Sequence, residues 1–342
     1  MTVVDLHTHF LPAFFVEEAA AGGVFGVREE DGFIVHPEGF RYPVHPEFVN
    51  AQAKLADMDR RGIDASVLSG APTLFFYGAG AEEAVDFARR SNDALAELVA
   101  TSDRLGGLAA LPLQDPHAAA AELERAVRQR GLLGAHIGTN SGATPLDAPE
   151  LEPVLAAAER LDVPLMLHPY YVGPKPGLEQ FYLVNSLGNP LDTTIAAVRL
   201  IHAGTLERFP ELRVALVHAG GFLPYQLGRF DHAHRVRPEP KLSLEQPPSS
   251  HLDRFWMDTI THGDGALGFL RDLIGPERLY LGTDLPFDMA DAGPLERLAR
   301  ADVDVHATHA AAATLLNRDV GEALRFASAT ESEPGAAAHL QS

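Results

Sequence analysis

Residues 3–12 read Val-Val-Asp-Leu-His-Thr-His-Phe-Leu-Pro, a short apolar run that ends at a proline and is typical of a buried parallel strand. His7 and His9 stand at i and i+2, so on a strand both rings project to the same side and can reach one metal ion. The spacing alone is equally compatible with a solvated or packing role for the pair. Its place at the end of the first strand favours a metal site.

The same kind of short apolar run recurs along the chain, separated by longer amphipathic stretches. The strand-like runs are residues 3–10, 65–69, 105–111, 133–137, 164–168, 213–218, 255–260 and 279–283. Helical periodicity covers residues 48–61, 82–100, 116–130, 150–160 and 193–208. Eight strands alternating with helices predict an α/β fold, a (β/α)8 TIM barrel. A doubly wound open sheet remains the alternative, because periodicity does not distinguish the two.

No linker or internal repeat divides the chain, so residues 1–327 are expected to form a single barrel domain. Residues 22–47 are rich in Gly and Pro and are long for a connection after the first strand. We expect them to form a small insert or lid. Residues 328–342 lack apolar periodicity and are expected to be a flexible C-terminal tail.

Composition excludes several classes of function. The 342 residues include 27 basic and 47 acidic side chains, a net charge of −20, which argues against nucleic acid or an anionic membrane as a partner. The chain has no cysteine, so disulfides, thiolate metal sites and a cysteine nucleophile are excluded. With no signal peptide and no membrane-length apolar run, we expect a soluble, cytoplasmic protein.

Three further strand-like runs end in a possible metal ligand. His168 closes Pro-Leu-Met-Leu-His, His218 closes Val-Ala-Leu-Val-His, and Asp284 follows Leu-Tyr-Leu-Gly-Thr. In a barrel the C-terminal ends of the strands converge on one face, so these side chains should meet those of the first strand. Imidazole and carboxylate ligands suit a borderline divalent cation, with zinc favoured.

The chain resembles the amidohydrolase superfamily, in particular the branch of aminocarboxymuconate-semialdehyde decarboxylase. The resemblance covers nearly the whole chain. The motifs that carry it are His-x-His at 7–9, Met-Asp-x-x-Gly at 58–62, Ile-Gly-Thr at 137–139, Ala-Ala-Ala-Glu-Arg-Leu at 156–161, His-Pro at 168–169, Glu-Arg-Phe-Pro at 207–210, His-Ala-Gly-Gly-Phe-Leu-Pro at 218–224, Gly-Arg at 228–229 and Gly-Thr-Asp-x-Pro-Phe at 282–287.

The resemblance implies a mononuclear metal centre. It assigns His7, His9, His168 and Asp284 as ligands of one divalent ion per subunit, Zn²⁺ first and Mn²⁺ as the alternative. It assigns His218 as the general acid/base, with Asp284 beside it in the catalytic set.

The resemblance also implies a substrate site. Arg41 and Arg229 would bind substrate carboxylates, and Arg229 would reach into the neighbouring subunit of a homodimer. A planar guanidinium suits a carboxylate because it donates two parallel hydrogen bonds. Tyr170 and Phe287, next to the ligand motifs, would contact the substrate. For both arginines the alternative is a solvated surface charge.

The fourth strand-like run separates this chain from the dinuclear members of the superfamily. Those members bridge two metals through a carbamylated lysine on this strand, whereas residues 132–138 here read Leu-Leu-Gly-Ala-His-Ile-Gly. One metal is therefore expected. His136 either lines the pocket or is a core histidine bonded to the backbone.

These features together predict a metal-dependent, non-oxidative decarboxylase. Its substrate would be a small unsaturated or aromatic carboxylic acid, of the aminocarboxymuconate-semialdehyde or salicylate type. No redox cofactor is needed, and no dinucleotide-binding glycine fingerprint is present. The alternatives are a hydrolase or hydratase that uses the same site, and a non-enzymatic barrel that holds its metal structurally.

Overall fold

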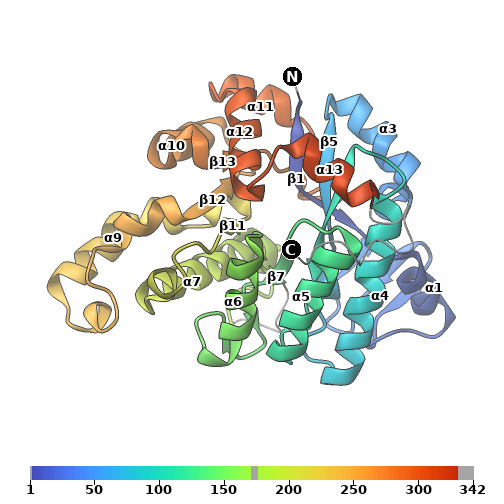
Figure 1. The fold of residues 1–342 in the computed structure, drawn as a ribbon, viewed down its shortest axis with the longest axis horizontal. Coiled ribbons are helices and arrows are strands. Elements are labelled where there is room, and N and C mark those ends of the chain that lie inside the picture. Colours follow the sequence, from blue (N-terminus) through green and yellow to red (C-terminus); the bar gives the residue numbers. More distant parts are fainter. Residues whose placement is uncertain (1, 171–175, 330–342) are drawn as a thin grey trace, which may run out of the picture.

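Eight parallel strands follow one another in chain order around the centre of the molecule. The computed structural model describes residues 2–170 and 176–329. The strand order is β1-β5-β6-β7-β10-β11-β12-β13, and helices surround these strands (Figure 1). Their bounds are β1 (Val4–Phe10), β5 (Ala65–Gly70), β6 (Leu105–Ala110), β7 (Ala135–Gly138), β10 (Leu165–His168), β11 (Val214–Leu216), β12 (Phe255–Asp258) and β13 (Leu279–Tyr280).

The chain that follows β13 closes the sheet against β1. The backbone N–H of Leu6 donates to the carbonyl of Leu281 at 3.0 Å, and that of His9 donates to the carbonyl of Leu285 at 2.8 Å. Every residue of β1 is buried, as expected for a strand covered on both faces. The barrel expected from the sequence is confirmed, and the open-sheet alternative is wrong.

Helices follow most of the strands, and their ends carry recognisable caps. Asn50 and Asp115 accept hydrogen bonds from the backbone at the starts of α3 and α5. Gly62 and Gly131 end the same two helices with φ of 71° and 68°, which glycine adopts without strain. The longer helices are α3 (Ala51–Arg61), α4 (Ala81–Val99), α5 (Pro116–Arg130), α6 (Glu152–Leu161), α7 (Asn189–His202), α9 (Leu223–Val236), α10 (Asp264–Ile274), α12 (Val305–Leu316) and α13 (Val320–Ala329).

Residues 22–47 contain a small antiparallel sheet of three strands. These are β2 (Arg28–Glu30), β3 (Phe33–Val35) and β4 (Arg41–Pro43). The sheet and the adjacent α1 (Ala13–Ala21) share a separate apolar cluster that includes Phe15, Ile34 and Tyr42. The insert places β4 at the edge of the cavity described below.

Two further expectations concern the C-terminal tail and membrane-spanning segments. Helix α13 runs to Ala329, and the remainder of the expected C-terminal tail lies outside the described residues. Within the described ranges, no helix combines the length and apolarity required of a membrane span.

Candidate metal centre

Five side chains meet at the C-terminal ends of the barrel strands. His7 and His9 come from β1, His168 ends β10, and His218 and Asp284 follow β11 and β13. His7, His168, His218 and Asp284 each offer one ligand atom, and these four atoms lie within 4.8 Å of one another. The Nε2 atom of His9 lies 3.2 Å from Nε2 of His7 and 3.0 Å from Oδ1 of Asp284.

The cluster is buried, and for His9, His168 and Asp284 the electrostatics favour the forms that bind metals. His7 and His9 are fully buried, and His168 and Asp284 nearly so. Burial lowers the pKa of His9 to about 4 and holds that of His168 well below its usual value. Burial raises the pKa of Asp284, but hydrogen bonds with His218 and His9 outweigh it, and the net pKa lies well below the usual range. Neutral His9 and His168 beside the ionised Asp284 suit a divalent cation. Burial also lowers the pKa of His7, but the hydrogen bond with Asp258 and the nearby carboxylates outweigh it, and the net pKa lies above its usual value.

Two hydrogen-bond patterns show that the cluster fits a cation. Nδ1 of His168 donates to the carbonyl of Pro169 at 2.5 Å, while its buried Nε2 has no partner in the described chain. Nδ1 of His7 donates to Asp258 at 2.8 Å, which leaves its Nε2 lone pair directed at His9. The unpartnered Nε2 of His168, together with the Nε2 atoms of His7 and His9 beside Asp284, makes the donor set of a zinc- or manganese-type site.

Close backbone contacts explain the glycines near His218. Asp258 at the end of β12 accepts the backbone N–H of His218 at 2.9 Å. A Cβ atom at Gly221 would lie 2.1 Å from the carbonyl oxygen of Pro190, and one at Gly220 would lie 2.7 Å from Sδ of Met257. The Gly-Gly pair therefore lets the chain turn sharply after β11 and present the His218 ring to the cluster.

Lys54, like Asp258, is a buried group beside the site that sequence reasoning did not select. Its Nζ donates to Oγ1 of Thr8 at 2.9 Å, and Thr8 in turn donates to the carbonyl of Leu285 at 2.9 Å. Burial lowers the pKa of Lys54 to about 8, against the charges of neighbouring carboxylates led by Asp5. The chain of bonds ties the end of β1 to the segment that carries Asp284. Neither Lys54 nor Asp258 lies in a motif that sequence spacing could single out.

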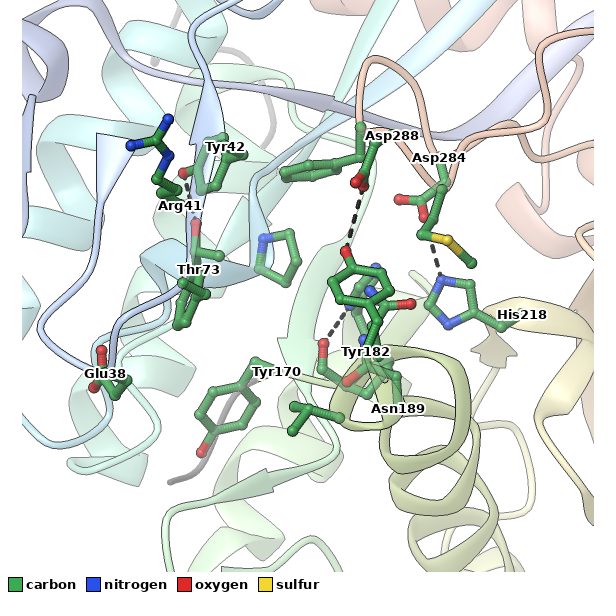
Figure 2. Close-up of a pocket in the computed structure, with 18 of the residues that line it drawn as sticks. Glu38, Arg41, Tyr42, Thr73, Tyr170, Tyr182, Asn189, His218, Asp284 and Asp288 are labelled. Atoms are coloured by element: carbon green, nitrogen blue, oxygen red, sulfur yellow. Dashed lines mark hydrogen bonds and ion pairs between the residues drawn. The ribbon is translucent and has the colours of Figure 1, made fainter. Parts of the chain in front are cut away.

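A cavity of about 550 Å³ opens above the cluster. His168, His218 and Asp284 line one end of it, and the insert lines another side through β4. Figure 2 shows His218 beside Asp284, with their ring nitrogen and carboxylate oxygen 3.5 Å apart. Tyr170 also lines the cavity, and its hydroxyl is held by Asn140 at 3.1 Å.

Phe287 forms an aromatic wall of the cavity. Its ring lies 5.2 Å from that of His9 and 5.2 Å from that of Tyr42, measured between centroids. Tyr42 belongs to β4 of the insert, and its hydroxyl bonds to Oγ1 of Thr73 at 2.8 Å. Phe287 thus joins the insert to the ligand cluster.

The two arginines expected to bind substrate lie in different places. Arg41 lines the cavity from the insert, on the side of Figure 2 away from His218. Its guanidinium stacks 4.3 Å above the ring of Phe33 and forms no ion pair within the described residues. Arg229 is an exposed residue of α9 and does not line this cavity of its own chain.

His136 lies next to the ligands and outside the cavity lining. It is 1% exposed, and its ring centroid is 5.2 Å from that of His168 and 5.6 Å from that of His9. Burial holds its pKa well below the usual value. It does not contribute to the cavity of about 550 Å³, which agrees with a core position. Its Nε2 has no hydrogen-bond partner within the described residues, so the expected bond to the backbone is not found at this atom.

The chain matches known proteins over nearly its whole length. The sequence profile of the family described as Amidohydrolase matches residues 4–322. The chain belongs to the amidohydrolase family. It is 31% identical over 301 residues to 2-amino-3-carboxymuconate-6-semialdehyde decarboxylase of Dictyostelium discoideum, covering 85% of this chain and 83% of the relative. The expected branch of the amidohydrolases is therefore confirmed.

Solved structures of decarboxylases share the fold over most of their length. The 5-carboxyvanillate decarboxylase of Sphingomonas paucimobilis superposes with a TM-score of 0.77 at 26% identity, covering 93% of this chain and 99% of the other. A dihydroxybenzoic acid decarboxylase of Polaromonas sp. JS666 was solved with bound manganese and the inhibitor 2-nitroresorcinol. It superposes with a TM-score of 0.75 at 27% identity, covering 92% of this chain and 97% of the other. The manganese bound in that structure agrees with a divalent metal at the donor cluster found here.

Proposed function

We propose that this amidohydrolase is a metal-dependent, non-oxidative decarboxylase of an unsaturated or aromatic carboxylic acid. The observation that carries the proposal is the buried cluster of histidines and Asp284 at the end of a cavity of about 550 Å³. Relatives that cover most of the chain are named decarboxylases of such acids. The cavity volume suits a small aromatic or conjugated acid.

In this proposal His7, His9, His168 and Asp284 hold one divalent ion, Zn²⁺ first and Mn²⁺ as the alternative. These residues would hold an ion whose chemistry, when bound, would be Lewis-acid polarisation of a substrate oxygen. The neutral imidazoles and the carboxylate in the cluster support this ligand set.

His218 supplies the proton in this reaction. Its ring is partly exposed and lines the cavity, and its Nε2 lies 3.5 Å from Asp284. When the carbon–carbon bond breaks, carbon dioxide leaves and the electron pair stays on the substrate carbon. That carbon then takes a proton from His218, which general acid/base catalysis requires to be within hydrogen-bond reach. No oxidant or reductant is consumed.

Substrate binding is assigned to the cavity walls. Arg41 has no carboxylate partner in the described chain, so its guanidinium can bind a second acidic group of the substrate. Tyr170 and Phe287 offer aromatic surface for a conjugated or ring substrate. Arg229 is assigned to the neighbouring subunit's site in a homodimer, which agrees with its exposure on α9.

Product analysis tests the proposal. Metal-loaded protein is incubated in D₂O with a panel of hydroxylated benzoic acids and conjugated enoic acids, and carbon dioxide and product mass are measured. We expect carbon dioxide release with one deuterium at the carbon that lost the carboxylate, and no release after chelator treatment. A product heavier by one D₂O, without carbon dioxide, would assign a hydratase instead.

A further inference from the structure

Asp258 ends β12 at the centre of the site and is 0% exposed. Its Oδ2 accepts two hydrogen bonds, from Nδ1–H of His7 at 2.8 Å and from the backbone N–H of His218 at 2.9 Å. One carboxylate oxygen therefore touches both a proposed metal ligand and the proposed acid/base residue.

The other oxygen of Asp258 holds the turn that carries His218. Oδ1 accepts the backbone N–H of Ala219 at 2.7 Å and that of Ile260 at 3.1 Å. His218 and Ala219 have φ of 53° and 56°, two consecutive left-handed residues without glycine. Such a backbone persists only where surrounding contacts over-determine it, and Asp258 bonds to the N–H group of each of the two residues.

We infer that Asp258 is a positioning residue that couples the metal ligand His7 to His218. Its carboxylate fixes the Nδ1–H tautomer of His7, so that Nε2 is free to bind metal, and it holds the His218 ring toward Asp284. The part that concerns His218 rests on the proposed decarboxylase function. The part that concerns His7 requires only that the cluster binds a divalent cation.

Substitution by asparagine separates this role from simple space filling. Asp258→Asn keeps the shape and size of the side chain but replaces one acceptor oxygen with an NH₂ donor. In one orientation of the amide, the donor faces His7 Nδ1–H and the backbone N–H of His218. In the other, it faces the N–H groups of Ala219 and Ile260. Either way, an arrangement with four accepted hydrogen bonds is lost.

The experiment measures metal affinity and turnover separately. Affinity of metal-free Asp258→Asn for Zn²⁺ and Mn²⁺ is determined by competition with a chromogenic chelator, and kcat and KM are determined at saturating metal. We expect affinity about 10- to 100-fold weaker than wild type. At saturating metal we expect kcat to fall about 10-fold or more, with KM nearly unchanged, because general acid/base catalysis depends on the placement of His218.

Glu122→Gln is the matched control. Glu122 is likewise a buried carboxylate, 2% exposed on α5, and it accepts hydrogen bonds from Asn92 and Arg125. These partners lie on the outer helices, so this variant should lose thermal stability while keeping metal affinity and kcat. Asp258→Asn that behaves like the control, with wild-type affinity and kcat, would overturn the inference.

A second measurement applies if Asp258→Asn does not fold. In ¹⁵N NMR spectra of metal-free wild-type protein, with the His7 signals assigned by the loss of signal in His7→Gln, we expect the Nδ1–H tautomer. An Nε2–H tautomer would overturn the inference without any Asp258 variant. If wild-type protein binds neither Zn²⁺ nor Mn²⁺, the proposed function fails. If it binds them and Asp258→Asn binds them equally well, the positioning role alone fails.

Discussion

His9 and His218 compete for one position in the ligand set. The compact group of four donor atoms includes His218, whereas His9 is the residue that the family motif assigns to the metal. His9 is fully buried, and its Nε2 lies 3.0 Å from Asp284; His218 is partly exposed and faces the cavity. A ligand is expected to be shielded and an acid/base residue to reach substrate, so burial favours His9 as the ligand.

Alanine substitution distinguishes the two histidines. His9→Ala should lose bound metal and activity together, because a ligand is removed. His218→Ala should retain metal while its turnover falls about 10²- to 10⁴-fold. Metal content is measured by inductively coupled plasma mass spectrometry on purified protein. A His218→Ala protein without metal would make His218 a ligand, and one with full turnover would remove it from the mechanism.

Gly282 is a residue whose importance comes from close packing. A Cβ atom there would lie 2.9 Å from the Cβ atoms of both His7 and Asp258, closer than packed carbon atoms approach. Gly282→Ala should therefore displace both side chains, reduce metal content and lower the melting temperature. Gly228→Ala on α9 is the control, because a Cβ atom there meets nothing within 4 Å and alanine favours helix. Equal metal content in the two variants would contradict the prediction.

At the scale of elements, the barrel strands end earlier than the apolar runs suggest. The run 213–218 becomes β11 (Val214–Leu216), and 279–283 becomes β13 (Leu279–Tyr280). His218 and Asp284, which follow them, have φ of 53° and 63°. Hydrophobic periodicity reveals buried strands but not the local turn that directs a side chain into a site. The place of His218 and Asp284 at this end of the barrel was therefore predictable, and their backbone conformation was not.

Residues that support the site were harder to predict than the ligands. Asp258 and Lys54 act through hydrogen bonds to groups far away in sequence, with Asp258 and His7 251 residues apart. Asp258 lies inside the apolar run 255–260 and not at its end, so it did not stand out as a strand-end donor in the way that Asp284 did. The three short strands of the insert were not predicted either, because strands of three residues carry too little periodicity.

The folding stability of the protein should fall in acid because of His36 in the insert. This residue, between β3 and β4, is 5% exposed and stacks 4.1 Å from the ring of Phe40, and burial lowers its pKa to about 4. Above about pH 6.5 the side chain is neutral in both folded and unfolded chains. Below that, only the unfolded chain takes up the proton, so stability falls as pH drops toward 4.

A comparison of wild type with His36→Phe isolates this contribution. Between pH 7 and pH 5 the wild-type free energy of unfolding should fall by about 2 kcal/mol more than that of the variant. Urea denaturation of the metal-free proteins at both pH values measures the difference, and groups elsewhere cancel in the comparison. Parallel curves for the two proteins would show that His36 is not buried in neutral form.

At the scale of the whole molecule, the site is expected to be shared between subunits. Arg229 is exposed on α9 and does not line the cavity of its own chain. A two-fold contact would bring it to the neighbour's cavity and add positive charge in a protein of net charge −20. Arg229→Ala should then raise KM and lower kcat with metal content unchanged.

Mixing experiments test the shared site. Arg229→Ala and His218→Ala proteins, each impaired alone, should recover part of the activity when refolded together, because some hybrid dimers contain one complete site. Wild-type protein that light scattering shows to be a monomer, and that is fully active at nanomolar concentration, would contradict the shared site. Arg229 would then be a solvated surface charge.

The closure of the barrel between β1 and the chain after β13 also bears on biosynthesis. His9 and Asp284, which bond to each other at 3.0 Å, are 275 residues apart in sequence. While a ribosome is still adding the residues before Asp284, the nascent chain displays the first histidine pair without the carboxylate that completes the site. With the proposed ligands, the full set can assemble only after translation has passed the eighth strand, and chains terminated before that point cannot complete it.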